Sequence, residues 1–260
     1  MKGVPQHALE AWREIERRVR RAGRLSLFTD FDGTLVPIVR TPGQVRLAPR
    51  VRRLLAHLAK KGVLVGIASG RRLSDVRARA GVRHIYYIGS HGFSWASPGR
   101  RREILLEPKQ LAAMAEVRRA LTGNLRGLAG IHVEPKEGAL AVHYRAASKR
   151  NAAAAEAAIR ELLATRLRLH LLCGKKVWEL LPERQTSKWT AIRRILDQEP
   201  RTGSRLLFYL GDDSTDERVF QRMAGISVAV GKRRATAARF YLRSPREVHL
   251  FLERLREVLT

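Results

Sequence analysis

Apolar residues in the first third of the chain follow two different patterns. Largely apolar runs of four to six residues predict buried strands, and these runs occur at 25–28, 63–68 and 85–88. Between them, apolar residues recur three and four positions apart, which predicts helices over 5–22, from Pro49 and from Ser74. This alternation of strands and helices favours a parallel sheet with helices on both faces.

The pattern changes after Gly92. The following segment is predicted to contain two helices, at 108–126 and 149–165, and several short strands separated by turn residues. The strands are expected at 93–95, 103–106, 131–134, 139–145, 169–172 and 177–181. Two helices against an antiparallel sheet make an α+β module.

The first pattern resumes after residue 185. Two strands are expected there, at 206–210 and 226–230, together with three helices: one at 187–196, one after the stretch Gly211 to Glu217, and one from Pro245. We therefore predict an α/β protein with a Rossmann-like parallel-sheet core. Residues 1–92 and 186–260 form this core, and residues 93–185 form an inserted α+β cap domain.

Polar residues follow several predicted core strands directly. They are Asp30 and Asp32 after the first strand, Ser69 after the second, His91 after the third, and Asp212 and Asp213 after the strand at 206–210. Open α/β sheets bind ligands at the carboxyl ends of their strands, so we expect a site there. At strand periodicity Asp30 and Asp32 face the same way, which suits either a Mg²⁺ site or a nucleophile and acid pair. A surface turn that happens to be acidic is the alternative.

The composition is that of a globular protein, with 260 residues of which 45% are hydrophobic and 29% are charged. No apolar run approaches the ~18 residues that a membrane-spanning helix needs. Residues Met1 to Arg21 lack the apolar core of a signal peptide. Cys173 is the single cysteine, which excludes an intrachain disulfide, and its place after an apolar run predicts a buried side chain. We therefore expect a cytoplasmic protein.

The net charge of +27 results from 51 Lys and Arg residues against 24 Asp and Glu residues. Such an excess can indicate a nucleic acid or an acidic membrane surface as the partner. The arginines, however, are scattered through every segment and form no basic tail and no aromatic-interleaved patch. Solvated helix faces explain them at least as well, so we expect no specific nucleic-acid partner and no membrane partner.

Phosphoryl transfer needs the residue types found at these strand ends, together with Lys188 at the start of a predicted helix. A carboxylate can attack phosphorus to form an acyl-phosphate, and a second carboxylate can protonate the leaving alkoxide. A hydroxyl and an ammonium can bind the phosphoryl oxygens. Further carboxylates can hold Mg²⁺, which offsets the repulsion between an anionic nucleophile and an anionic phosphate.

The order of these motifs resembles that of the haloacid dehalogenase superfamily of phosphatases. The matching residues are Asp30-Phe31-Asp32-Gly33-Thr34-Leu35, Ser69, Lys188 and Gly211-Asp212-Asp213, with the insert between Ser69 and Lys188 where that superfamily carries a cap. The resemblance implies that Asp30 is the nucleophile and Asp32 the general acid and base. It also implies that Ser69 and Lys188 bind the phosphate.

The same resemblance implies a Mg²⁺ site. Its ligands would be Asp30, the backbone carbonyl of Asp32, the carboxylate of Asp212, and Asp213. The neighbouring Asp216 leaves one point open, because either Asp213 or Asp216 could hold metal-bound water or steady Lys188.

A finer resemblance is to the trehalose-6-phosphate phosphatase family. It rests on Ser69-Gly70-Arg71, Gly89-Ser90-His91-Gly92, Glu134-Pro135-Lys136-Glu137-Gly138, His143-Tyr144-Arg145, Lys176-Val177-Trp178-Glu179 and Gly211-Asp212-Asp213-Ser214-Thr215-Asp216-Glu217. In that family, cap residues matching Glu134, Lys136 and Glu179 bind sugar hydroxyls. The resemblance also places Arg71, His91 and Arg145 in the substrate site. One departure is Trp189 after Lys188, where the family often has glycine.

The resemblance implies a Mg²⁺-dependent phosphatase that hydrolyses trehalose 6-phosphate through an aspartyl-phosphate. A phosphatase for another sugar phosphate, such as sucrose phosphate or mannosyl-phosphoglycerate, is an alternative. A basic nucleic-acid-binding protein on a phosphatase scaffold is a second alternative, motivated by the net charge of +27. We expect a monomer whose partner is a small-molecule sugar phosphate.

Overall fold

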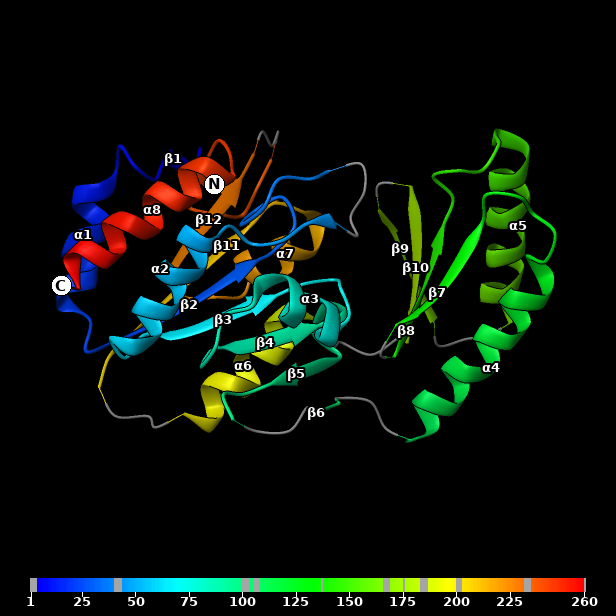
Figure 1. The fold of residues 1–260 in the computed structure, drawn as a ribbon, viewed down its shortest axis with the longest axis horizontal. Coiled ribbons are helices and arrows are strands. Elements are labelled where there is room, and N and C mark those ends of the chain that lie inside the picture. Colours follow the sequence, from blue (N-terminus) through cyan, green and yellow to red (C-terminus); the bar gives the residue numbers. More distant parts are fainter. Residues whose placement is uncertain are drawn as a thin grey trace. The chain divides into compact units, whose positions relative to one another are not determined.

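The computed structural model describes residues 4–39, 44–99, 103–104, 108–136, 138–165, 169–174, 176–182, 187–199, 203–231 and 235–259. The chain divides into two compact units (Figure 1). Unit 1 consists of Met1–Glu103 and Thr186–Thr260, and unit 2 consists of Ile104–Gln185. No helix in the described part of the chain is long and apolar enough to cross a membrane.

The described residues of unit 1 form a nine-stranded sheet with the strand order β1-β13-β12-β11-β2-β3-β4-β5-β6. The strands are β1 (Gln6–His7), β2 (Arg24–Asp30), β3 (Leu64–Ala68), β4 (Tyr86–Gly89), β5 (Ser94–Ala96), β6 (Glu103–Ile104), β11 (Arg205–Gly211), β12 (Ile226–Val230) and β13 (Phe240–Leu242). Along this order the neighbours from β1 to β4 pair in parallel, and β5 pairs antiparallel with β4. The predicted parallel-sheet core is confirmed.

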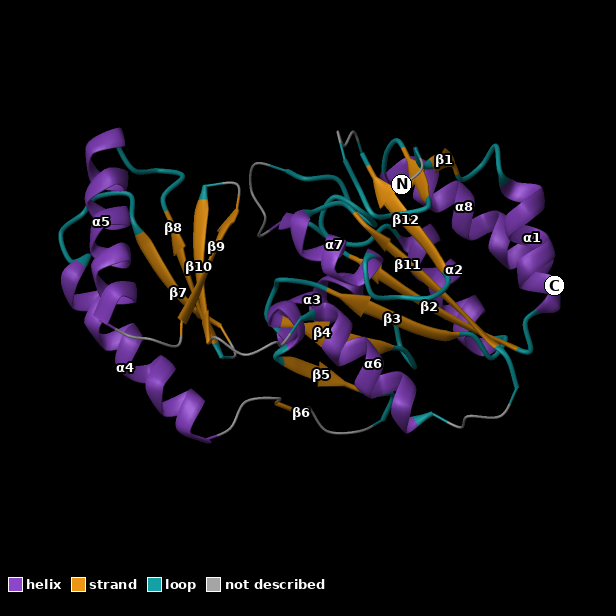
Figure 2. Ribbon diagram, turned by 180° about the vertical axis from the view of Figure 1, so that it is seen from behind, coloured by secondary structure: helices purple, strands orange, loops and turns teal. Residues whose placement is uncertain are grey.

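Helices cover both faces of this sheet. One set shares the main apolar cluster and consists of α1 (Trp12–Arg21), α2 (Pro49–Lys60), α3 (Leu73–Ala80) and α8 (Pro245–Val258). A second set packs together on the other face (Figure 2) and consists of α6 (Lys188–Gln198) and α7 (Ser214–Phe220). A 3₁₀ turn, η2 (Ser90–Gly92), packs against α6.

Strand β2 shows how the alternation of side chains directs one acid to the second set of helices. Leu25 and Leu27 belong to the apolar cluster with α1, α2, α3 and α8. The alternate residues Ser26, Phe28 and Asp30 are buried on the opposite face. Asp30 therefore points to the side of the sheet that carries α6 and α7.

The first helix is shorter than the sequence predicts. The periodicity over 5–22 predicts one helix, whereas α1 begins at Trp12. Gln6 and His7 instead form β1, which pairs in parallel with β13. Neither strand has more than three residues, and their pairing joins the two ends of the chain, so local periodicity does not indicate it.

The segment after residue 93 also differs from its predicted place. It was expected to begin the insert, but β5 pairs with β4 through Ile88 opposite Trp95 and Gly89 opposite Ser94. Strand β5 thus extends the sheet of unit 1 beyond β4. The boundary between the compact units falls after Glu103.

The described part of unit 2 forms an antiparallel sheet with the strand order β7-β8-β10-β9 and two helices. The elements are α4 (Pro108–Asn124), β7 (His132–Lys136), β8 (Ala139–His143), α5 (Lys149–Thr165), β9 (Leu169–Gly174) and β10 (Val177–Pro182). Met114 and Val117 of α4, Ile159 of α5, and Val142 and Trp178 of the sheet share one buried cluster. One face of the sheet therefore packs on both helices.

The prediction that Cys173 is buried is wrong, because its side chain is exposed. Cys173 lies near the end of β9, which is the edge strand beside β10. The apolar run before it correctly indicated a strand. It did not indicate that this strand has a neighbour on one side only.

Candidate active site

The carboxyl ends of three adjacent strands bring polar residues of unit 1 to one edge of the sheet. Asp30 is the last residue of β2, and it pairs with Ala68, the last residue of β3, directly before Ser69. On the other side of β2, strand β11 ends directly before Asp212. Asp30, Ser69 and Asp212 therefore lie at the same edge, although they are far apart in the sequence.

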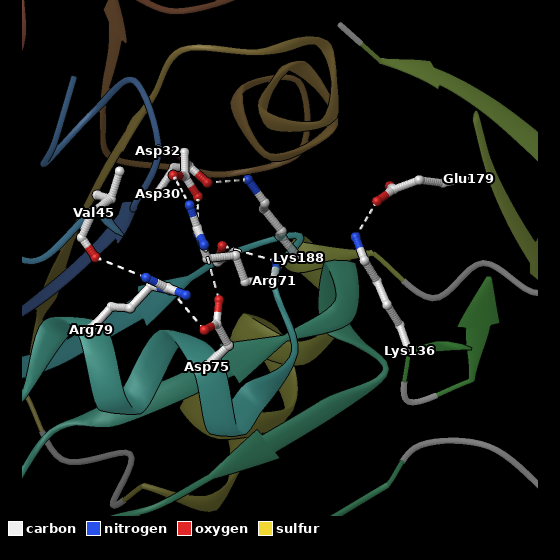
Figure 3. A network of polar contacts seen from close by, with 10 residues as sticks. Asp30, Asp32, Val45, Arg71, Asp75, Arg79, Lys136, Glu179 and Lys188 are labelled. Carbon is white, nitrogen blue, oxygen red and sulfur yellow. Dashed lines mark hydrogen bonds and ion pairs between the residues drawn. The ribbon is translucent and has the colours of Figure 1, made fainter. Parts of the chain in front are cut away.

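Lys188 reaches this edge from the first turn of α6, where Ser187 and Thr190 form a capping box. Its Nζ donates to Asp30 Oδ1 at 2.6 Å (Figure 3) and to Asp216 Oδ1 at 2.8 Å. All three charged side chains are buried. Trp189, the departure from the family pattern, is half-buried and does not prevent Lys188 from contacting Asp30.

Asp216 is the partner that holds Lys188 against Asp30. The hydroxyl of Tyr209 donates to Asp216 Oδ1 at 2.6 Å, and the backbone N–H of Asp213 donates to Asp216 Oδ2 at 2.9 Å. Burial and the charge of Asp216 raise the pKa of Tyr209 well above its usual value, so the hydroxyl keeps the proton that it donates. Of the two residues that the sequence left open, Asp216 is the one that contacts Lys188.

Asp212 completes a group of carboxylates with Asp30 and Asp216, in which one oxygen of each lies within 4.8 Å of the others. Gly33 makes room for Asp212, because a Cβ at Gly33 would lie 2.1 Å from Asp212 Oδ2. The φ of Gly33 is also +85°, a conformation that favours glycine. Position 33 therefore needs glycine because the side chain of Asp212, which directly follows β11, occupies the space that a Cβ would fill.

Burial and neighbouring charges shift the pKa values of Asp30 and Lys188 in this group. Burial raises the pKa of Asp30 well above its usual value; the Lys188 ammonium opposes this rise, and the charges of Asp216 and Asp212 add to it. Burial lowers the pKa of Lys188, but the carboxylates of Asp216 and Asp30 outweigh it, and the net shift is upward. Lys188 therefore stays protonated. Asp212 adds a third acid to Asp30 and Asp216, so this group among the described residues offers carboxylate oxygens that suit a cation.

The carboxylate of Asp32 pairs with Arg71. Arg71 Nε and Nη2 donate to the two oxygens of Asp32 at 2.6 and 2.7 Å, which is a bidentate ion pair (Figure 3). Strand periodicity, on which the expectation that Asp30 and Asp32 face the same way was based, does not extend to Asp32. Strand β2 ends at Asp30, and Asp32 lies in the turn that follows.

Ser69 and His91 shape the turn beside this pair. Ser69 Oγ accepts the backbone N–H of Arg71 at 3.1 Å, and the Ser69 carbonyl accepts the backbone N–H of His91 at 3.1 Å. His91 has a left-handed backbone conformation, with φ of +56°. Its ring lies against Gly70, where a Cβ would approach the ring to 2.6 Å. His91 is therefore brought to the end of β3 by close packing on a glycine.

Asp213 serves as the N-cap of α7. Its Oδ1 accepts the backbone N–H and the hydroxyl of Thr215, both at 2.6 Å. Burial raises the pKa of Asp213, but the charge of Lys188 and the bonds from Thr215 outweigh it and lower the pKa overall. Asp213 was predicted as a metal ligand, yet the group of three acids found among the described residues does not include it.

In unit 2, the strand register aligns the two glutamates that were predicted to bind sugar. Glu134 of β7 lies opposite Ala141 of β8, and Ala141 lies opposite Glu179 of β10. The two carboxylates thus share one face, separated by a small side chain. Lys136, two residues after Glu134, shares this face, and its Nζ donates to Glu179 Oε1 (Figure 3). This face is opposite the one that packs on α4 and α5.

His143 belongs to the same face, although the sequence assigned it no role. Its Nε2 lies 2.9 Å from Glu134 Oε2. Arg145, predicted as a substrate residue, follows the end of β8 and is exposed. Arg145 is therefore not among the residues Glu134, Ala141 and Glu179, which are aligned across the three neighbouring strands.

Comparison with known proteins decides the family. The family model described as trehalose-phosphatase matches residues 28–245 of the chain. The chain belongs to the trehalose-phosphatase family. The match extends from β2 to the start of α8, so it includes both units.

Similar proteins agree with this membership of the trehalose-phosphatase family. A trehalose-phosphate phosphatase of Mycobacterium tuberculosis (strain ATCC 25618 / H37Rv) is 36% identical over 239 residues, which is 88% of this chain and 61% of the relative. The chain thus spans less than two thirds of that relative's length. The solved trehalose-6-phosphate phosphatase of Aspergillus fumigatus is 27% identical, with a TM-score of 0.68 over 98% of this chain and 99% of that chain. The C-terminal domain of the C. albicans enzyme has the same fold, with a TM-score of 0.82 at 23% identity over 98% of this chain and 99% of that chain.

In this trehalose-phosphatase family member, several site residues were not found from the sequence. They are Tyr209, Asp75 and Arg79; His143 was part of a quoted family motif but was given no role. Tyr209 lies within the apolar run of β11, where a buried aromatic residue indicates only a core position. Asp75 and Arg79 are spaced like an ordinary surface ion pair of a helix, so their spacing gave no sign of the contact with Arg71.

Proposed function

We propose that this chain is a Mg²⁺-dependent phosphatase that hydrolyses trehalose 6-phosphate to trehalose and phosphate through an aspartyl-phosphate on Asp30. The observation that carries the proposal is the buried contact of 2.6 Å between Lys188 Nζ and Asp30 Oδ1, at the edge where Ser69 and Asp212 also lie. The substrate is supported by family membership and by the name of the M. tuberculosis relative. We also propose that the protein acts as a monomer in the cytoplasm.

In the proposed reaction, a carboxylate oxygen of Asp30 attacks phosphorus, and the bond between phosphorus and the sugar oxygen breaks. Asp32, protonated beforehand, gives its proton to the leaving sugar oxygen. Lys188 orients the Asp30 carboxylate and, with Ser69, binds the phosphoryl oxygens. Asp32 then takes a proton from a water molecule, and the water oxygen attacks phosphorus. Phosphate leaves and the Asp30 carboxylate is restored.

The acidic group at this edge suits Mg²⁺, because its described members Asp30, Asp212 and Asp216 all offer carboxylate oxygens. We assign Asp30, Asp212 and the backbone carbonyl of Asp32 as its ligands, with Asp213 contacting it through water. Both oxygens of Asp216 already accept hydrogen bonds, so we assign Asp216 to Lys188. When bound, the ion would neutralise charge on the transferring phosphoryl group.

We propose that Glu134, Lys136 and Glu179 bind the sugar hydroxyls. Carboxylates accept hydrogen bonds from hydroxyl groups and an ammonium donates to them, so this face offers both kinds of partner to a polyol. His143 would orient Glu134 through their 2.9 Å contact.

Three further substrate contacts are proposed, and they differ in their support. His91 and Arg145 are not members of the Lys136–Glu179 ion pair, and their assignment as substrate residues rests on the family resemblance alone. Arg71 uses three of its N–H groups on Asp32 and Asp75. For Arg71 the contact with Asp32 is therefore better supported than a direct contact with the sugar.

A phosphate-release assay tests the proposal. Trehalose 6-phosphate, sucrose phosphate, mannosyl-phosphoglycerate and p-nitrophenyl phosphate are supplied with Mg²⁺, and each is repeated with a chelator. We expect the fastest release from trehalose 6-phosphate and none from Asp30→Asn, in a preparation whose circular dichroism spectrum shows that the variant is folded. Preference for another sugar phosphate would overturn the substrate, and release by Asp30→Asn would overturn the mechanism.

A further inference from the structure

Asp32 stands at the end of a chain of ion pairs that continues through Arg71 and Asp75 to Arg79 (Figure 3). We propose that Asp75 is a positioning residue for the reaction: it fixes the guanidinium of Arg71, which in turn fixes the carboxylate of Asp32. This inference rests on the proposed function, in which Asp32 protonates the leaving group.

The geometry of Arg71 divides its N–H groups between the two acids. Nε and Nη2 donate to Asp32 at 2.6 and 2.7 Å, while Nη1 donates to Asp75 Oδ2 at 2.9 Å. Because the guanidinium is planar and rigid, fixing Nη1 on one side sets the plane in which the other two groups meet Asp32. The side chain of Arg71 is 13% exposed, whereas that of Asp32 is 36% exposed. Arg71 is thus the more enclosed partner.

Asp75 is itself fixed by a second arginine, Arg79. Arg79 Nε donates to Asp75 Oδ1 at 2.7 Å, and Arg79 Nη1 donates to the carbonyl of Val45 at 3.1 Å. The backbone carbonyl of Arg79 also accepts the N–H of Leu47 at 3.0 Å. Each oxygen of Asp75 therefore has its own arginine, and the second arginine is anchored to the segment before α2. Asp75 can move little without breaking one of these bonds.

The backbone of Arg71 is equally fixed. Its N–H donates to Ser69 Oγ at 3.1 Å, and its carbonyl accepts the N–H of Ser90 at 2.7 Å. The guanidinium lies 5.8 Å from the centre of the Phe31 ring. The side chain of Arg71 is long, and the bond from Nη1 to Asp75 restricts its conformation on the side away from Asp32.

The positioning role predicts a loss that depends on the leaving group. Trehalose leaves as a poor alkoxide and needs a proton from Asp32, whereas p-nitrophenolate is a good leaving group and needs little protonation. We expect Asp75→Asn to lower kcat/KM for trehalose 6-phosphate roughly tenfold or more. The same variant should change kcat/KM for p-nitrophenyl phosphate less than about threefold. This ratio covers substrate binding and phosphoryl transfer to Asp30, since kcat/KM does not include hydrolysis of the aspartyl-phosphate.

The controls separate this role from a structural one. Glu156→Gln removes an i,i+4 ion pair with Arg160 on α5 that is more exposed than the Arg71–Asp75 pair, and it should change kcat/KM for neither substrate. Asp75→Glu keeps the charge and should recover part of the loss. Arg79→Gln removes the hydrogen bond to Asp75 Oδ1. It should lower kcat/KM for trehalose 6-phosphate by a smaller factor than Asp75→Asn, and again by more than kcat/KM for p-nitrophenyl phosphate. It also tests the proposal if Asp75→Asn does not fold.

An equal loss on both substrates in Asp75→Asn and Arg79→Gln, with unchanged unfolding midpoints, would overturn the positioning role. Asp30→Asn is measured beside them and should lose both substrates. If Asp30→Asn stays active, the proposed function fails. If Asp30→Asn is inactive while Asp75→Asn affects both substrates equally, the positioning role alone fails.

Discussion

Replacing Lys188 with methionine removes the ammonium that contacts both Asp30 and Asp216. The side chains of Lys188, Asp30 and Asp216 are 2%, 7% and 0% exposed, so water cannot replace the lost contacts without local opening. Breaking a buried ion pair by removal of one partner costs about 3–5 kcal/mol, because the remaining charge stays buried. For a protein of this size, about 2–4 °C of unfolding midpoint corresponds to 1 kcal/mol, so we expect a fall of roughly 6–20 °C.

A double variant tests the cause of this destabilisation. Lys188→Met together with Asp216→Asn removes the ammonium and one of the two acids, so fewer charges are left without a partner. We expect the double variant to be less destabilised than the sum of the single variants by about 1–3 kcal/mol. Urea unfolding in the presence of a chelator measures this at constant pH. Lys61→Met, at an exposed position of unit 1, is the matched control and should have little effect.

Two results would refute this reasoning. The first is a destabilisation of Lys188→Met by less than about 1 kcal/mol, which is the value expected for an exposed pair. The second is strict additivity in the double variant, because it would mean that the ammonium and Asp216 do not interact in the folded protein.

Three further predictions concern other parts of the molecule. Tyr209→Phe keeps the ring but removes a hydrogen bond to a buried carboxylate, so urea unfolding should show a loss of about 1.5–3 kcal/mol; no loss would remove this bond from the site. Glu134→Ala should raise KM for trehalose 6-phosphate about tenfold or more and leave KM for p-nitrophenyl phosphate unchanged; equal effects would remove Glu134 from sugar recognition. Burial raises the pKa of Glu247, but the hydrogen bonds from the Arg243 backbone and from His7 outweigh it and lower the pKa below the usual 4.5. The Glu247 carboxylate therefore stabilises the fold above that pH and loses this effect as the pH falls through its lower folded pKa. Glu247→Gln should lower the unfolding midpoint at pH 7 and match the parent protein in acid, and an equal difference at both pH values would contradict this.

The edge that carries Asp30, Ser69 and Asp212 could be predicted from the sequence because one rule suffices. Parallel strands place their carboxyl ends together, so residues directly after apolar runs meet whatever their separation along the chain. The strands themselves are recognisable because both faces are buried and the runs are continuously apolar. The helix from Pro49 was equally clear, because proline at its first position and one apolar face agree.

Contacts that depend on exact geometry could not be predicted in this way. Which acid contacts Lys188 depends on the N-cap of α7. There, Asp213 accepts a hydrogen bond from Thr215, and Asp216 accepts one from Lys188. The meeting of Glu134 and Glu179 depends on the register of three strands, and a shift of one residue would move a side chain to the other face.

The pairing of Asp32 with Arg71 was also beyond the sequence. It depends on where β2 ends, and a difference of one or two residues in that position decides whether Asp32 follows strand periodicity. The short strands β1 and β13 were missed for a related reason. Strand β1 pairs with β13 from the opposite end of the chain, β13 also pairs with β12, and a segment of two or three residues shows no periodicity of its own.

The central claim is that Asp30 becomes phosphorylated during turnover. The most direct measurement is to quench the enzyme during reaction with trehalose 6-phosphate, reduce it with borohydride, and analyse its peptides by mass spectrometry. Borohydride reduces an aspartyl-phosphate to homoserine and leaves a free aspartate unchanged. We expect homoserine at position 30, and none when the substrate is omitted. Homoserine at another acid, or none at position 30 while the same sample releases phosphate, would contradict the assignment of Asp30 as the nucleophile.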